Sequence, residues 1–386
     1  MKRAGKIGLA TVLAATVLAA PAKAQDDAFV LPPWTGAYEP QDEDERGFWQ
    51  TVDELEDKLK HSKEIVRNEA LDRYIRGVLC ETVGDDRCAA ARIYVLRDHD
   101  FNAGMYPNGM MIVNTGLLLR MRNEAELASV LGHEFGHFEK RHAVDLFKTA
   151  RSGSDFAAWT TVLIGAPIAS LFYSNVFQHS RDMETDADFV SHGYLARSRY
   201  PSRASSEIWL RLIDEDDRRA EERKRRKRNR NTSWLATHPA PLKRADYLAK
   251  ASAAANDQGD YATQAYRDAM RDHLLSFFDD QLQRNDFAAS KYLLEQLAGD
   301  DWQADHRIMQ GELFRKRGHE RDLTSAEQAY RAALDLGTDR PEVWRGMGLV
   351  MLKQGRRDEA VEALRTYLER APDASDAAMI TMMIGG

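Results

Sequence analysis

The stretch that decides this sequence runs from residue 126 to residue 137 and reads Glu-Leu-Ala-Ser-Val-Leu-Gly-His-Glu-Phe-Gly-His. Residues four apart lie on one face of an α-helix, so His133 and His137 can present two ring nitrogens to one Zn²⁺. Glu134 lies beside them, placed to take a proton from a metal-bound water rather than to bind the metal. The pattern predicts a zinc peptidase. A short motif also arises by chance, so a helix that merely carries two histidines is the alternative at this point.

Length and composition indicate a soluble protein with more than one domain. At 386 residues the chain is long enough for two domains and a targeting segment. The 43% share of hydrophobic residues can build cores, and the 30% share of charged residues suits a soluble protein. The formal net charge of -7 gives no reason to expect nucleic acid as a partner.

The first residues have the pattern of a secretory signal. A basic start precedes the apolar run of residues 7–20, and residues 22–24 (Ala-Lys-Ala) fit a small-x-small cleavage site. We therefore expect residues 1–24 to be a signal peptide, with an uncleaved membrane anchor as the alternative. In an oxidising compartment Cys80 and Cys88 could form a disulfide, with two free thiols as the alternative.

The following part of the chain shows helical and strand patterns in turn. Residues 25–48 are rich in proline and acidic residues and are predicted to be extended. Apolar residues at helical spacing follow from Trp49 to Cys80. Two short strands are predicted at Arg92–Leu96 and Met110–Val113, joined through Asn-Ala-Gly and Pro-Asn-Gly turns. Asn123 is the predicted N-cap of the helix that carries the two histidines.

Two further segments bear on possible partners. Residues 156–173 are nearly all apolar but carry glycine and proline in the middle, which favours a buried or peripherally membrane-touching element over a true span. Residues 214–230 form a charge run with a basic block at 223–228. Such a run is typical of a solvated helix end or loop, with an acidic partner as the alternative.

The pattern changes beyond about residue 255. Aromatic, small and proline residues recur there at the spacing of a 34-residue helix-turn-helix repeat. Each such unit leaves an apolar face that only a neighbour covers, so the units should stack, and an irregular helical bundle is the alternative. The residues that define the last unit are Trp344, Met347, Gly348, Met351, Gly355, Ala360, Leu364, Tyr367 and Pro372.

The proposed zinc site needs a further ligand. Zinc in hydrolases usually has three protein ligands and an open position for water. Within residues 180–188, helical spacing puts Glu184 and Asp188 on one face. Glu184 can then bind the metal while Asp188 accepts a hydrogen bond from a ligand histidine. Taken alone, this segment also fits a surface acidic helix.

Several motifs stand in one order along the chain: Asn102-Ala-Gly, Asn114-Thr-Gly-Leu117, His133-Glu-Phe-Gly-His137 with His142, Ser180-Arg181-x-x-Glu184-x-x-Ala187-Asp188 and Thr237-His238-Pro239. This order resembles the gluzincin metallopeptidases related to HtpX and the CAAX prenyl proteases, over roughly residues 50–250. With its leader and repeats, the chain is most similar to the periplasmic BepA-type branch, which carries C-terminal tetratricopeptide repeats.

The resemblance implies a role for each matching residue. His133, His137 and Glu184 would be the ligands of one Zn²⁺ per chain. Glu134 would be the general base that activates water for attack on the peptide bond. Asp188 would not bind the metal but would hydrogen-bond to one of its ligands.

Three more residues match positions of the family. His238 would lie near the metal, where it would either stabilise the oxyanion or occupy the fourth zinc position in a latent state. The alternative is that residues 237–239 only form a turn that begins a helix. His142 and Arg244 would have supporting roles. His142 follows His137 by five residues, an angular step that takes it away from the ligand face.

The strand before the zinc helix is expected to have a second use. In zinc peptidases an edge strand can pair with an extended substrate backbone, which gives affinity without demanding particular side chains. An ordinary internal strand is the alternative. The residues of this predicted substrate-binding strand are Gly109, Met110, Met111, Ile112 and Val113.

Together these features predict an α+β, mostly helical protein. A zincin-like metallopeptidase domain with a small β-sheet would span residues 49–254, and a tetratricopeptide-repeat domain would span residues 255–386. The expected function is a periplasmic zinc endopeptidase for misfolded or stalled envelope and outer-membrane proteins, with repeats that dock substrate or assembly machinery. A chaperone or adaptor with latent proteolysis is the alternative, and a membrane-surface protease using residues 156–173 is a third hypothesis.

Overall fold

The computed structural model describes residues 33–151, 180–222, 241–255 and 258–385. It is mostly helical with one small sheet, and the helical C-terminal part is built of repeats, so the predicted α+β class is confirmed. Among these residues, no helix is both long and apolar enough to cross a membrane. Four predictions lie outside the described residues: the signal peptide at 1–24, the apolar segment at 156–173, the basic block at 223–228 and His238.

The N-terminal segment becomes helical sooner than predicted. Helix α1 spans Glu43–Lys60, and the Asp42 carboxylate caps it by accepting a hydrogen bond from the Glu45 backbone N–H. The extended segment predicted at residues 25–48 is therefore wrong at its C-terminal end. Acidic residues are favourable in a first helical turn, where they face the positive end of the helix dipole.

The single helical stretch predicted from Trp49 to Cys80 is two helices. Residues 61–68 leave the helical path, and the Asn68 side chain caps a new helix by accepting from two backbone N–H groups. The elements that follow α1 are α2 (Glu69–Val83) and α3 (Asp85–Cys88).

The sheet has three strands in the order β1-β3-β2. Strand β1 (Arg92–Leu96) lies parallel to β3 (Met110–Asn114), and β2 (Ala103–Met105) lies antiparallel to β3 on its other side. Because β3 is paired on both sides, the prediction of a substrate-binding edge at residues 109–113 is wrong. The strand at the edge of the sheet on the side of the histidine helix is instead β2, whose residues were expected to form a turn.

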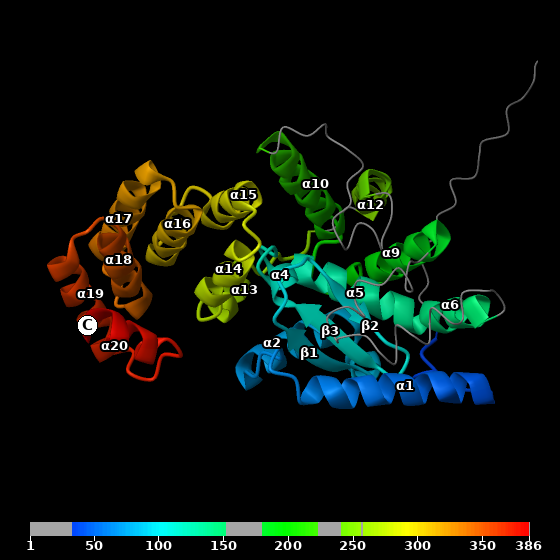
Figure 1. The fold of residues 1–386 in the computed structure, drawn as a ribbon. Coiled ribbons are helices and arrows are strands. Elements are labelled where there is room, and N and C mark those ends of the chain that lie inside the picture. The colour runs from blue at the N-terminus through cyan, green and yellow to red at the C-terminus, as the bar shows by residue number, and fades with distance from the viewer. Residues whose placement is uncertain (1–32, 152–179, 223–240, 256–257, 386) are drawn as a thin grey trace, which may run out of the picture.

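Strand β3 forms the centre of two cores. Met110 and Ile112 pack with the apolar face of α1, whereas Met111 and Val113 belong to the main core on the other side of the sheet. All five residues of β3 are buried. Figure 1 shows α1 below the sheet and α5 above it. The helices on the α5 side are α4 (Thr115–Leu118), α5 (Glu124–Glu139), α6 (His142–Arg151), α9 (Arg181–Leu195), α10 (Ala204–Glu222) and α12 (Pro241–Ala255).

Two glycines let the helix of the zinc motif approach α9. A Cβ added to Gly136 would lie 3.1 Å from the backbone oxygen of Ala187, and one added to Gly132 would lie 3.0 Å from Ser191 Oγ. The Ser191 hydroxyl also donates to the backbone oxygen of Ser129 across the same contact. The close approach of α5 and α9 brings the histidines of one helix to the carboxylates of the other.

The C-terminal half is a series of stacked helices. Tyr330 is fully buried and occupies the space left by Gly311 and Gly346, where an added Cβ would come within 2.4 Å of its ring. Such close packing explains why small residues recur in the repeat pattern. The helices are α13 (Thr263–Met270), α14 (Leu274–Leu282), α15 (Phe287–Ala298), α16 (Ala304–Arg317), α17 (Glu320–Asp335), α18 (Pro341–Lys353), α19 (Arg357–Arg370) and α20 (Ala377–Gly385).

The hydrophobic core does not stop at the predicted domain boundary. The cluster that contains Leu131 of α5 also contains Phe278, Met309 and Leu313 of the repeat region. The first repeat helices are thus part of the core around the α5 helix, while the last helices form cores of their own.

Buried charges also join the two parts. Arg120 donates to both carboxylate oxygens of Glu215 on α10, at 2.7 and 2.8 Å, and to the Gln281 side chain on α14 at 3.1 Å. Arg219 of α10 reaches Asp286, the N-cap of α15, at 2.5 Å. A buried polar contact of this kind holds only if its partners stay in register, so it fixes α14 and α15 against α10.

Candidate metal centre

Three ligand atoms from two helices converge on one point. The Nε2 atoms of His133 and His137 lie 3.0 Å apart. Glu184 places Oε2 3.6 Å from Nε2 of His133 and Oε1 3.4 Å from Nε2 of His137. All three residues are buried, and their ligand atoms all lie within 4.8 Å of one another, close enough to hold one metal ion.

These separations fit zinc. Four tetrahedral ligands at about 2.0–2.1 Å from Zn²⁺ lie about 3.3 Å from one another, close to the three distances seen here. Two imidazoles and one carboxylate are also a usual donor set of hydrolytic zinc sites with one open position. The donors present therefore fit a zinc ion, with His133, His137 and Glu184 as the residues that would hold it.

Asp188 sets the tautomer of His133. Its Oδ1 lies 2.9 Å from His133 Nδ1, so the ring donates from Nδ1 and keeps a lone pair on Nε2. Burial lowers the pKa of His133, as does the charge of Arg244, which favours the neutral ring that a metal requires. Burial would raise the pKa of Asp188, but Arg244 and His133 lower it to about 2, so this carboxylate is ionised.

His142 supports the second histidine in the same way. Its Nδ1 lies 2.8 Å from Nδ1 of His137, so one ring donates to the other. With the proton on His137 Nδ1, Nε2 of His137 faces the metal position and His142 carries its own proton on Nε2, 3.7 Å from Asp186 Oδ2. The chain turns after α5 at Arg141, whose φ is 61°. On a continuous helix His142 would point away from His137, and the turn brings the two rings together.

Arg244 of α12 lies behind the carboxylates. It donates from Nε and Nη2 to both oxygens of Asp188, at 2.7 and 2.5 Å, and from Nη1 to Glu184 Oε2 at 2.7 Å. Its guanidinium carbon lies 3.9 Å from the ring centroid of Trp209, a cation–π contact. The arginine is 2% exposed, so its charge is balanced by the two carboxylates rather than by water.

Two residues that contact Arg244 or Asp188 could not be predicted from the sequence. Trp209 and Tyr247 complete the surroundings of Arg244, and the Tyr247 hydroxyl donates to Asp188 Oδ2. Neither lies in a recognisable motif, and only the packing of α12 against α9 and α10 brings them to the site. Tyr247 follows Arg244 by three residues on the same helix face, which is a signal only once Arg244 is known to face the site.

Glu134 occupies the buried interior of the site. Burial raises the pKa of Glu134 well above its usual value, and the charge of Glu184 adds to this effect while Arg244 opposes it. A carboxylate in such a place holds a proton more readily than one in water, the property that a proton carrier needs. A cation between the histidines would lower the pKa of Glu134 again and so favour its ionised carboxylate form.

The remaining predicted residues are the two cysteines, His238 and the strand from Gly109 to Val113. Cys80 and Cys88 form a disulfide between α2 and α3, with Cα atoms 4.9 Å apart. His238 lies outside the described residues. The strand Gly109 to Val113 lies inside the sheet, as described above.

Comparison with known proteins agrees with this geometry. Residues 67–252 match the model of Peptidase family M48, and residues 319–381 match a tetratricopeptide repeat. A Vibrio cholerae protein named "Putative beta-barrel assembly-enhancing protease" is 27% identical over 199 residues, covering 47% of this chain and 39% of that protein. The mitochondrial metalloendopeptidase OMA1 of Saccharomyces cerevisiae is 27% identical over 159 residues, covering 40% of this chain and 45% of its own length.

A mammalian relative extends the same pattern. The mitochondrial metalloendopeptidase OMA1 of Bos taurus is 29% identical over 171 residues, covering 40% of this chain and 31% of the relative. The chain thus spans less than half the length of each of these relatives. The residues that match the family model, 67–252, include the helices that carry His133, His137 and Glu184.

Proposed function

We propose that this chain, which carries a domain of Peptidase family M48 at residues 67–252, is a zinc-dependent endopeptidase acting on misfolded or stalled envelope proteins in the periplasm. The observation that carries the proposal is the convergence of His133, His137 and Glu184 on one point with Glu134 beside them. A zinc ion held there would polarise the scissile carbonyl and lower the pKa of a water molecule towards about 7.

The chain's own residues supply proton transfer and positioning. Glu134 takes the proton of the attacking water and later passes it to the nitrogen of the leaving amine, the usual task of a buried carboxylate with a raised pKa. Asp188 and His142 hold the rings of His133 and His137 so that both Nε2 atoms keep their lone pairs towards the metal position. His238 remains a proposed oxyanion stabiliser or fourth ligand.

Strand β2 is the proposed binding edge for the substrate backbone. In an antiparallel pair every second residue hydrogen-bonds to the neighbouring strand. Here the backbone N–H of Asn114 donates to the oxygen of Asn102, and the N–H of Tyr106 donates to the oxygen of Met110. Ala103 and Met105 therefore turn their backbone N–H and C=O groups away from β3. An extended peptide could add to this edge as a further strand, which favours unfolded substrates over compact ones.

Three features support the periplasm and the envelope as the setting. The Cys80–Cys88 disulfide suits an oxidising compartment. The Vibrio cholerae relative carries the assembly of beta-barrels in its name. The tetratricopeptide repeat at residues 319–381 is a protein-binding module in which each unit adds to an extended surface. Docking of substrate or of outer-membrane assembly machinery to these repeats is part of the proposal, as is a peripheral membrane contact.

The decisive test is cleavage of an unfolded protein by the zinc-loaded chain and by Glu134→Gln. Unfolded outer-membrane protein and casein serve as substrates, and zinc content is measured on the same samples. We expect Glu134→Gln to retain zinc and lose cleavage by at least about a hundredfold. Glu362→Gln, an exposed acid on α19, is the matched control and should cleave normally. Undiminished cleavage by Glu134→Gln would remove the proposed mechanism.

A chaperone or adaptor role is the second candidate. The observation that favours it is the helical C-terminal region, whose last helices have hydrophobic cores of their own. If Glu134→Gln rescued envelope defects of a strain lacking the gene as fully as the unaltered chain does, binding rather than cleavage would be the main function.

A further inference from the structure

A large cleft lies where the peptidase part meets the repeats, away from the metal centre. Its volume is about 710 Å³, within the roughly 300–1,000 Å³ typical of ligand pockets. It is bordered by the loop before α5, by α13 and α14, and by the turns that precede α16 and α18. Ten residues of α5 separate Asn123, at this cleft, from His133, which corresponds to about 15 Å along the helix.

The floor of the cleft is apolar. Leu118 and Met121 come from the peptidase side, and Met270, Phe277 and Leu297 come from the repeat side. These side chains also belong to or pack on the main core, so the floor is a continuation of it. An apolar floor with polar groups at its rim is the usual composition of a site for peptides or small organic ligands.

The cleft is held by fixed walls. The Tyr266 hydroxyl on α13 donates to the backbone oxygen of Leu118. On the opposite side, Arg340 donates to the backbone oxygen of Arg271 at 3.2 Å and to Asp305 at 3.3 Å, which ties the turn before α18 to α13 and α16. A binding site whose walls are already ordered loses less entropy when a ligand enters.

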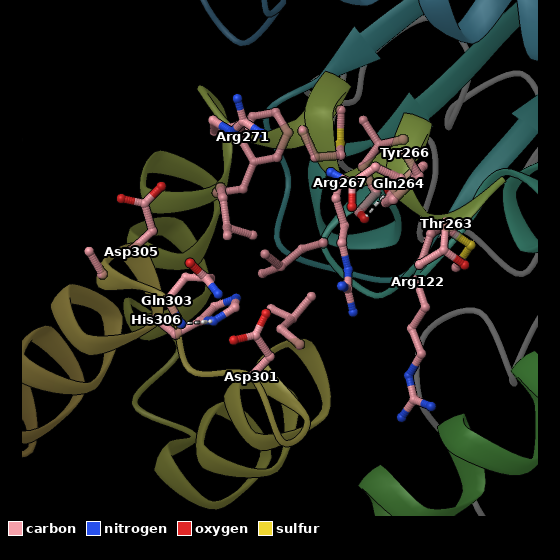
Figure 2. A pocket seen from close by; sticks show the side chains of 18 of the residues that line it. Arg122, Thr263, Gln264, Tyr266, Arg267, Arg271, Asp301, Gln303, Asp305 and His306 are labelled. Atoms are coloured by element: carbon pink, nitrogen blue, oxygen red, sulfur yellow. Dashed lines mark hydrogen bonds between the residues drawn. The ribbon is translucent and has the colours of Figure 1, made fainter. Parts of the chain in front are cut away.

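Two arginines face this space without a counter-ion among the described residues. Arg271 pairs with Asp268 and Arg340 with Asp305, whereas Arg122 and Arg267 form no ion pair in the part of the chain that the structure covers. Figure 2 shows both side chains reaching from the peptidase side and α13, with Asp301 across from them.

Of the two arginines, Arg122 is the more deeply buried. Its Nε is buried and has no hydrogen-bond partner among the described residues, and the nearby Glu126 already accepts two hydrogen bonds from Arg211. Burial lowers the pKa of Arg122, and the charge of Arg211 lowers it further. A partly buried cation without a partner is costly, and an incoming anion would relieve this cost.

The acidic residues across the cleft have no such need. Asp301 and Asp339 are exposed to water, and Asp305 is already paired with Arg340. Solvated side chains gain little from a new partner, and this holds for the exposed Arg267 as well, so the preference for an anion rests on the partly buried Arg122. The cleft should therefore prefer an anion at its basic wall over a cation at its acidic wall.

We propose that this cleft is a docking site for an extended peptide segment that combines apolar side chains with acidic ones. Alternate side chains of an extended peptide point to opposite sides, so one set can fill the Leu118–Met270 floor while carboxylates of the other meet Arg122 and Arg267. The site is separate from the metal centre and does not depend on the proposed peptidase activity.

Fluorescence anisotropy on the zinc-loaded, full-length Glu134→Gln protein tests this site without interference from cleavage. The probes are a fluorescein-labelled eight-residue peptide of leucine, phenylalanine and glutamate, and its counterpart with lysine in place of every glutamate. We expect the acidic peptide to bind at least tenfold more tightly than the basic one. Arg267→Glu, at an exposed position, should weaken the acidic peptide at least tenfold and strengthen the basic one. The control Arg365→Glu, exposed on α19 away from the cleft, should change neither affinity.

Other results would overturn the proposal. Equal affinity for the two peptides would exclude recognition of acidic side chains, and an unchanged affinity in Arg267→Glu would place binding elsewhere. A dimer in light scattering that Arg267→Glu dissociates would show that a second copy of the chain covers the cleft. The peptidase test is read from cleavage and this test from binding, so failure of one does not imply failure of the other.

Discussion

Arg244 donates a hydrogen bond from Nη1 to Oε2 of Glu184, across 2.7 Å. One guanidinium on α12 thereby orients the carboxylate ligand of the proposed zinc site, and its other nitrogens hold the Asp188 carboxylate that fixes His133. The helix after the described segment 180–222 is therefore part of the metal centre, although none of its residues would contact the metal.

We expect Arg244→Lys to lower zinc affinity by about 10- to 100-fold, because a lysine cannot hold two carboxylates at once with the planar fork of an arginine. Competition with a chromophoric chelator measures this affinity. Unfolding should also become easier, by about 3 kcal/mol or more, since Asp188 is left buried with less compensation. Arg365→Lys is the control for the substitution itself, and an Arg244→Lys protein with normal zinc affinity would contradict the assigned role.

The His137–His142 contact makes a second prediction. His142→Ala removes the group that orients the His137 ring, so zinc affinity should fall about tenfold while the ligand set stays complete. The same chelator competition measures the loss, and His142→Asn should recover part of it because an amide can still hydrogen-bond Nδ1. His61→Ala, at an exposed helix end, should leave zinc binding as it was. Equal loss in the alanine and asparagine variants would indicate a packing effect only.

The outer edge of β2 can be tested with proline. Ala103→Pro removes a backbone N–H that points away from β3, so the sheet should survive while one hydrogen bond to the substrate is lost. We expect kcat/KM to fall about three- to tenfold with zinc content unchanged. Because Ala103 is buried in the main core, thermal stability is measured as well, so that a packing loss is told apart from a lost substrate bond. Substrate peptides N-methylated at successive positions give the complementary measurement. If no position of methylation and no proline on β2 affects cleavage, the substrate does not pair with this edge.

Asp216 predicts a pH dependence of stability. Burial raises the pKa of Asp216 to about 6, partly offset by Arg219 and reinforced by Glu215. The folded protein therefore binds this proton more tightly than the unfolded chain does. The associated stability is fully present below about pH 4 and is lost as the pH rises through about 6.

Asp216→Asn should remove this dependence. Relative to the unaltered chain, the variant should gain on the order of 2–3 kcal/mol in unfolding free energy between pH 4.5 and pH 7.5. Denaturant titrations at the two pH values measure the difference, and Asp214→Asn, two residues away and exposed, is the control. A difference that stays constant with pH would show that Asp216 does not titrate in this range.

Local patterns in the sequence were enough to propose the ligand set, because zinc ligands follow helical spacing. The two histidines are one turn apart, and Glu184 and Asp188 are one turn apart, so each pair could be placed on a helix face without knowledge of the fold. The convergence of the two helices could not be derived in this way. It depends on Gly132 and Gly136, whose lack of a side chain lets α9 approach.

The wrong and missing predictions share a physical cause. Strand β2 is three residues long and contains glycine, so its pattern is that of a turn, and the order of strands in a sheet is not written in any one of them. Without β2, strand β3 could be taken for an edge. The acidic residues at 42–45 resemble a solvated segment until the Asp42 cap shows that they begin a helix. The Arg120–Gln281 contact joins positions 161 residues apart, beyond the reach of any local pattern.

The shared core has a consequence for biogenesis. Because Met309 and Leu313 complete the same cluster as Leu131, the helix that carries the two histidines cannot reach its final packing until the chain has been synthesised past residue 313. A nascent fragment that ends before α16 would lack part of this packing. The final approach of His133, His137 and Glu184 would thereby be completed only after most of the chain has been made.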